Sequence, residues 1–102
     1  MTNKELLELA AKAAGYKMHP EKFVGDYWLK DGMVWNPLTD DGDALRLAVK
    51  LQLCVDIGYA IEFVGVLING EYVVDVKQGD DPYAATRRAI VRAAAEIGKE
   101  MK

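Results

Sequence analysis

Side chains that could carry nucleophilic chemistry are few in this chain. It contains no serine, so neither a Ser-His-Asp triad nor a phosphate loop that relies on a serine hydroxyl can form. Cys54 and His19, the one cysteine and the one histidine, are far apart in the sequence and could pair only through the fold. We expect Cys54 at the end of an apolar helix, where a buried, unreactive thiol is the usual finding. The sequence therefore predicts a protein that is not an enzyme and has no cofactor.

Acidic residues gather at two places, and both groups can be explained as helix starts. Asp40, Asp41 and Asp43 resemble part of a calcium-binding loop, but the spacing that ends in a bidentate glutamate is absent. Asp80 and Asp81 likewise precede a predicted helix. Carboxylates there accept hydrogen bonds from free backbone N–H groups and interact favourably with the helix dipole. The pattern predicts helix caps and no metal site.

The candidates for ligand recognition are aromatic and cationic. Trp28 and Trp35 could stack on a ligand ring, or pack against a helix as a cross-strand pair. Arg87 is expected at the edge of an apolar helix face, where its charge needs a partner, either an internal aspartate or an anionic ligand. Arg88 and Arg92 could clamp a phosphate or face solvent. We predict a ligand site formed by Arg87, Arg88, Trp28 and Trp35, with a nucleotide-like small molecule as ligand.

Two dipeptides predict hairpins that would position these residues. Asp31-Gly32 and Asn69-Gly70 each lie between apolar runs, and both readily adopt the positive φ values of type I′ turns. In the first hairpin, a regular register places the two tryptophans opposite each other. Residues 16–26, which contain His19-Pro20, are expected to form a connection.

Helix-start signals precede three amphipathic segments. Thr2 and Glu5 form a capping box, and Gly15 is placed for a left-handed C-terminal cap. A second helix should run from the Asp40 region to about Cys54, and a third should start at Asp81-Pro82. The predicted buried stripes are Leu6, Leu7, Ala10, Ala13 and Ala14 in the first helix, Ala44, Leu45, Ala48, Leu51 and Val55 in the second, and Tyr83, Ile90, Ala93, Ala94, Ile97 and Met101 in the third.

The second hairpin is apolar on both faces near its turn. A regular two-residue loop predicts a core face that consists of Ile61, Phe63, Gly65, Leu67, Tyr72, Val74 and Val76. The opposite face holds Val64, Val66, Ile68 and Val73, which are too apolar to face water. This face should be covered either by a helix or by another subunit, and we expect a homo-oligomer.

Together these elements predict an α+β fold in a single domain over residues 1–102. The expected order is α-ββ-α-ββ-α, an antiparallel sheet of about four strands with helices packed on it. The net charge of −3 gives no positive field, so general nucleic-acid binding is not expected. No signal peptide or membrane-length apolar run is present, and the single cysteine allows no internal disulfide. These features predict a cytoplasmic protein that does not bind membranes.

Several short motifs resemble a known family. Trp35-Asn36-Pro37 leads into Ala44-Leu45, and after a strand pair Asp81-Pro82 leads into Arg88-Ala89-Ile90 and Ala93-Ala94-Ala95. This pattern covers nearly the whole chain and is similar to the phage ABA sandwich domain proteins, which bacteriophages and prophages encode. The resemblance implies an α/β/α sandwich, with helices on the two sides of the antiparallel sheet. It also implies an accessory phage protein in the host bacterial cytoplasm, and it transfers no catalytic residue.

Two functions fit that context. In the first, the protein binds and sequesters a small anionic, nucleotide-like host signal through arginines and tryptophans. In the second, it is an interaction module that inhibits or redirects a host or phage protein by surface contact. A concave pocket where arginine and aromatic side chains converge would favour the first function, and a flat apolar patch would favour the second.

Overall fold

The computed structural model describes residues 1–17, 23–24, 27–30, 32–60 and 62–101. The predicted turn residue Asp31, the core position Ile61 and the dipeptide His19-Pro20 lie outside these ranges. In chain order, the elements are α1 (Asn3–Ala14), β1 (Phe23–Val24), β2 (Tyr27–Lys30), β3 (Met33–Trp35), α2 (Asp41–Lys50), β4 (Cys54–Ala60), β5 (Phe63–Ile68), β6 (Glu71–Lys77) and α3 (Pro82–Glu100).

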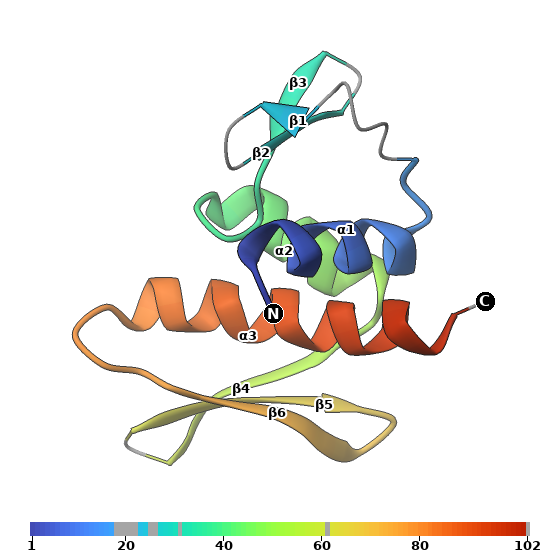
Figure 1. Cartoon of the computed structure of the whole chain (residues 1–102). Helices are drawn as coiled ribbons and strands as arrows, with labels where there is room; N and C mark the ends of the chain where they lie inside the picture. The colour runs from blue at the N-terminus through green and yellow to red at the C-terminus, as the bar shows by residue number, and fades with distance from the viewer. Residues whose placement is uncertain (18–22, 25–26, 31, 61, 102) are drawn as a thin grey trace.

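The helices lie between two antiparallel sheets (Figure 1). β1-β2-β3 form one three-stranded sheet and β4-β5-β6 form the other. α3 packs against β5 and β6 on one side and against α1 and α2 on the other. The predicted α+β class is confirmed, but two separate sheets replace the expected single sheet of about four strands between helices. Because α3 is apolar on two sides, it can cover one sheet and still pack against the other helices.

The two sides of α3 belong to two core clusters. Between the helices lie buried Leu6, Leu7, Ala10, Ala11, Ala14, Trp35, Ala44, Leu47, Ala48, Ile90, Val91, Ala94 and Ala95. Between α3 and the second sheet lie Val64, Val66, Val74, Val76, Ala85, Ala89 and Ala93. The predicted one-sided stripe of α3 is therefore incomplete, and its members Tyr83 and Met101 are exposed.

Local signals at the helix ends are confirmed. The Thr2 hydroxyl accepts a hydrogen bond from the Glu5 backbone N–H at 3.1 Å, and the Glu5 carboxylate accepts from the Thr2 backbone N–H. Gly15 ends α1 in the left-handed conformation, with φ 80°. Asp40 and Asp81 cap α2 and α3 through their side chains, and Pro82 occupies the first turn of α3.

α2 is shorter than predicted. It ends at Lys50, and Gln52 then takes a left-handed conformation with φ 55°, which breaks the helix before β4 begins. Cys54 therefore lies on a strand and is exposed, in contrast to the buried helical thiol that we predicted. Leu47 is buried in place of the predicted Leu45, which is exposed.

The first hairpin has the predicted register. Trp28 pairs with Trp35, and Lys30 pairs with Met33. Gly32 in the turn has φ 78°, which a residue without a Cβ tolerates. The expected connection over residues 16–26 is only partly a connection, because Phe23–Val24 add a short strand to β2.

The second hairpin has the predicted turn but an unexpected bulge. Asn69 and Gly70 have φ values of 53° and 84°, as a type I′ turn requires. Leu67 pairs with Tyr72 while Val66 pairs with Val74, so Val73 is an extra residue in β6. On β6, the core-face prediction is therefore correct for Val74 and Val76 and wrong for Tyr72, which is exposed. On the facing strand β5, it is wrong for Phe63, which is exposed.

On β5 the bulge reverses the predicted orientation. Val64 and Val66 are fully buried, whereas Phe63 is exposed and Leu67 is half-buried. α3 supplies the helix cover that we gave as one alternative for the Val64 and Val66 face. Since this cover comes from the same chain, these two valines no longer indicate a second subunit.

Candidate functional site

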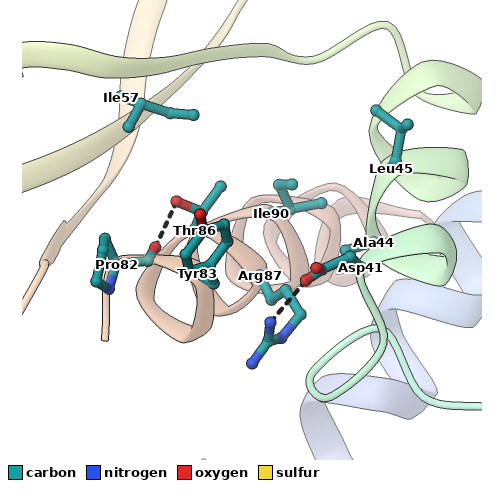
Figure 2. A pocket seen from close by; sticks show the side chains of 9 residues that line it. All are labelled: Asp41, Ala44, Leu45, Ile57, Pro82, Tyr83, Thr86, Arg87 and Ile90. Atoms are coloured by element: carbon teal, nitrogen blue, oxygen red, sulfur yellow. Dashed lines mark hydrogen bonds and ion pairs between the residues drawn. The ribbon is translucent and has the colours of Figure 1, made fainter. Parts of the chain in front are cut away.

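A cavity of about 430 Å³ opens between α2, α3 and β4 (Figure 2). Side chains from α2, from β4 and from the first turns of α3 converge on it. The lining residues are Asp41, Ala44, Leu45, Ile57, Pro82, Tyr83, Thr86, Arg87 and Ile90.

Helical spacing brings the α3 residues to the cavity. Tyr83, Thr86, Arg87 and Ile90 are three or four residues apart and therefore share one face of the helix. The Thr86 hydroxyl donates a hydrogen bond to the Pro82 carbonyl at 2.7 Å, which satisfies its polar atom within the helix. This side chain therefore adds little unsatisfied polarity to the cavity wall.

Arg87 already has partners within the chain. Its Nη1 lies 2.6 Å from Asp41 Oδ1, and its Nε donates to the Leu38 carbonyl at 2.9 Å. The guanidinium side chain is 16% exposed, whereas that of Asp41 is 71% exposed. Of the two alternatives that we gave for Arg87, the structure contains the internal aspartate. Because Arg87 and Asp41 pair with each other, their opposite charges largely cancel at the cavity wall.

The cavity mouth carries large apolar side chains that face water. Leu45 and Tyr83 are 64% and 70% exposed, and Ile57 is also exposed. Val49 is exposed one turn beyond Leu45 on the same side of α2. We call the cavity together with Leu45, Val49, Ile57 and Tyr83 the α2–α3–β4 surface. Such a grouping of exposed apolar residues is typical of a binding surface.

Sequence reasoning missed this surface. Leu45 and Tyr83 were assigned to the core, and Val49 and Ile57 were not singled out. A signal was present in α2, because Ala44, Leu47 and Ala48 already fill one helix face and leave Leu45 as a surplus apolar residue. An apolar residue outside the buried face of α2 predicts a second apolar surface on this helix.

The predicted site residues do not converge at one place. Trp35 is 5% exposed and packs edge-on against the Tyr16 ring, with 5.7 Å between ring centroids. Arg88 is exposed, and its Nη1 lies 3.3 Å from Asn3 Oδ1. The backbone of Trp28 pairs with that of Trp35 in the first sheet. Among Trp35, Arg87 and Arg88, whose side chains the structure describes, Arg87 alone lines the α2–α3–β4 cavity.

Trp35 lines a second cavity of about 350 Å³, together with Tyr16, Lys30, Met33, Val34, Asp43 and Arg46. Arg46 donates to Asp43 at 2.7 Å, and this hydrogen bond raises the pKa of Arg46, which stays charged. Buried Asp43 also accepts from the Asn36 backbone N–H at 2.9 Å. The Nζ atoms of Lys30 and Lys50 lie 4.5 and 4.8 Å from the Tyr16 ring centroid. Cations and aromatic rings meet here, although the indole is almost completely covered.

Across the described ranges of the chain, no group of three or more His, Cys, Asp or Glu side chains could hold a metal ion. Nor does any described helix have the length and apolar character needed to cross a bilayer. On the second sheet, the Tyr72 hydroxyl donates to Asp56 at 2.8 Å, which raises the pKa of Tyr72.

Comparisons of the chain with protein-family models, with curated proteins and with solved structures found no match. The resemblance to the phage ABA sandwich domain proteins therefore stays a prediction.

Proposed function

We propose that this protein is a non-enzymatic interaction module that binds an apolar segment of a partner protein at the α2–α3–β4 surface. The observation that carries the proposal is the cluster of exposed large apolar side chains around a cavity of about 430 Å³. Removing such side chains from water stabilises a complex by about 25 cal/mol per Å² of apolar area, before the costs of association.

The polar groups of the cavity favour a protein segment over a small anionic ligand. A small-molecule site usually offers a few convergent polar groups that fix the orientation of the ligand. Here the Arg87 guanidinium and the Asp41 carboxylate bind each other, and the Thr86 hydroxyl binds its own helix. The exposed apolar side chains extend beyond the cavity along α2, as expected for contact with an extended partner.

The resemblance to phage proteins suggests the source of that partner. An accessory protein of this kind would act in the host bacterial cytoplasm, on a host or phage protein. Apolar anchor residues of the partner would enter the cavity, and the Asp41–Arg87 pair would lie at its polar margin.

A second candidate function is binding of a small anionic, nucleotide-like molecule. The cavity lined by Trp35 supports it, because Arg46 lines this cavity and Lys30 Nζ lies 4.5 Å from the Tyr16 ring centroid there. Arg46 is bound to Asp43, and Trp35 offers almost no exposed ring face, so this cavity supports the second function less well.

Native mass spectrometry of the tagged protein, purified gently from its host cells before and after phage infection, tests the proposal. We expect a protein partner at defined stoichiometry. Leu45→Glu should weaken its retention at least fivefold, because a charge would face the apolar anchor of the partner. Since Leu45 is largely exposed, the variant should fold like the parent, which circular dichroism can check.

Met33→Glu is the control, because Met33 is also apolar and largely exposed but lies outside the α2–α3–β4 surface, in the wall of the Trp35 cavity that belongs to the second candidate function. It should keep the partner. Equal retention by Leu45→Glu and the parent, or the absence of any protein partner, would contradict the proposal. A retained small anion in place of a protein would favour the second candidate.

A further inference from the structure

Another groove, separate from the two cavities described above, lies near the C-terminal end of α3, beside the β5–β6 turn. Its volume is about 740 Å³, and its walls come from the hairpin and from the last two turns of α3. The lining residues are Ile68, Asn69, Glu71, Val73, Glu96, Ile97, Glu100 and Met101. We call it the α3 C-terminal groove. It shares no lining residue with the α2–α3–β4 cavity.

The β-bulge in β6 helps to form the apolar part of this groove. Val73 is the extra residue of the bulge, and it lines the groove with Ile97 of α3 and with Met101, which follows the helix. Val73 and Met101 are exposed, and Ile68 and Ile97 are half-buried. A bulge commonly redirects a side chain, and here an aliphatic one lines a cavity open to solvent.

Three carboxylates surround these apolar side chains. Glu96 and Glu100 are four residues apart on α3, and Glu71 begins β6. Glu96 lies 3.5 Å from Lys99, while Glu71 and Glu100 form no ion pair among the described residues. Like charges four residues apart disfavour a helix, and carboxylates near a helix C-terminus oppose its dipole. Two cations of the chain already serve this end of α3, since Lys99 lies beside Glu96 and Lys12 Nζ donates to the Met101 carbonyl at 2.8 Å. Glu71 and Glu100 remain as the carboxylates that a cation of a partner could pair with.

We propose that the α3 C-terminal groove binds a basic amphipathic segment of another protein. An apolar side chain of that segment would contact Val73, Ile97 and Met101. Flanking lysine or arginine side chains would pair with Glu71 and Glu100. Nucleic acids and anionic lipid surfaces do not fit, since their phosphates would face the same carboxylates.

Fluorescence anisotropy with a labelled synthetic peptide of alternating leucine and lysine pairs tests this groove. The test variant is Glu71→Gln/Glu96→Gln/Glu100→Gln. The control variant, Glu8→Gln/Glu62→Gln/Asp80→Asn, neutralises three exposed carboxylates elsewhere on the surface. Both variants remove three negative charges from a chain of net charge −3, so they differ only in where the charges lie.

We expect the groove variant to bind the peptide about tenfold more weakly than the parent, and the control variant to bind within about twofold of it. Replacing the lysines of the peptide by glutamate, or its leucines by serine, should abolish binding. The groove variant should fold, since it removes repulsion at the end of α3. Equal losses in the two variants would reduce the effect to net charge and overturn the proposal, as would no binding to the parent or equal binding of the glutamate peptide.

Discussion

Arg87 has a cationic side chain beside an apolar helix face, and the structure explains how that charge is accommodated. Asp41 supplies an opposite charge at 2.6 Å, and the Leu38 carbonyl accepts a hydrogen bond from Nε. The side chain therefore ties α3 to the start of α2. Its role in the folded protein is structural, whether or not a ligand binds nearby.

Arg87→Ala should lower the free energy of unfolding by about 1–2 kcal/mol, because it removes a charged hydrogen bond to a partly buried carbonyl. The ion pair itself adds little, since Asp41 is largely exposed and well solvated. Urea unfolding followed by far-UV circular dichroism provides the measurement. Arg88→Ala is the neighbouring control and should change stability by less than about 0.5 kcal/mol. Similar losses in the two variants would show that the Asp41 and Leu38 contacts do not stabilise the fold.

The sequence could identify the need of Arg87 for a partner but could not choose the partner. Its position on the helix follows from local spacing, whereas Asp41 lies on another helix and meets Arg87 only after α2 and α3 pack. For the same reason Trp28 and Trp35 could be paired by register, but the burial of Trp35 against Tyr16 could not be predicted.

At the scale of the elements, the backbones of α1 and α3 approach closely at Gly98. A Cβ added to Gly98 would overlap with the carbonyl oxygen of Leu9, and it would lie 2.8 Å from the carbonyl carbon. Glycine usually weakens a helix interior by about 1 kcal/mol relative to alanine. Its place in α3 is therefore explained by the neighbouring helix and not by helix propensity.

Gly98→Ala should destabilise the protein by about 1–3 kcal/mol, because α1 must move away from α3 to admit the methyl group. Gly42→Ala in α2 is the matched control. Its Cβ would meet the end of the exposed Arg46 side chain at 3.1–3.2 Å, which can move, and it would lie 3.2 Å from Asp40 Oδ2, which accepts the capping hydrogen bond from the Asp43 N–H. We expect a change of less than about 1 kcal/mol there, because the gain in helix propensity offsets the crowding of the cap. Thermal unfolding of both variants decides between the two effects, and a stabilised Gly98→Ala would rule out the close approach.

Elements with a local chemical signal could be predicted, and those without one could not. The capping box at Thr2, the turn at Asn69-Gly70 and the Asp81-Pro82 start all use residues suited to one backbone geometry. The early end of α2 depends on Gln52 in a left-handed conformation, and the bulge falls on a valine. Neither residue type marks such a position, so the length of α2 and the buried face of β5 were misassigned.

At the scale of the molecule, α3 connects two cores. One cluster lies toward α1 and α2, and the other lies toward the second sheet. The sequence predicted the α+β class from the order of helices and strands. It could not predict that α3 is buried on both sides, because its many alanines fit either a narrow stripe or a fully enclosed helix.

Because both cores share α3, they should unfold together. Val66→Ala empties space in the cluster on the second sheet and should cost about 2 kcal/mol. Trp28 and Trp35 lie on strands of the first sheet and report on the other side of the molecule. Tryptophan fluorescence and far-UV circular dichroism should therefore show the same decrease in the unfolding midpoint of this variant.

A transition in which fluorescence stays at the parent midpoint while circular dichroism shifts would contradict this coupling. Leu7→Ala, in the cluster between the helices, is the reciprocal variant. It should lower the unfolding midpoint by the same amount in both measurements.

The contact between α1 and α3 also has a consequence for synthesis of the protein. Roughly 70 residues separate the end of α1 from the start of α3. At about 5–20 residues per second, α1 leaves the ribosome about 4–14 s before its main partner begins to appear. During that interval its apolar face, with Leu6 and Leu7, is open to water and to other nascent chains. Until α3 is made, α1 therefore offers an apolar helix face to which a chaperone can bind.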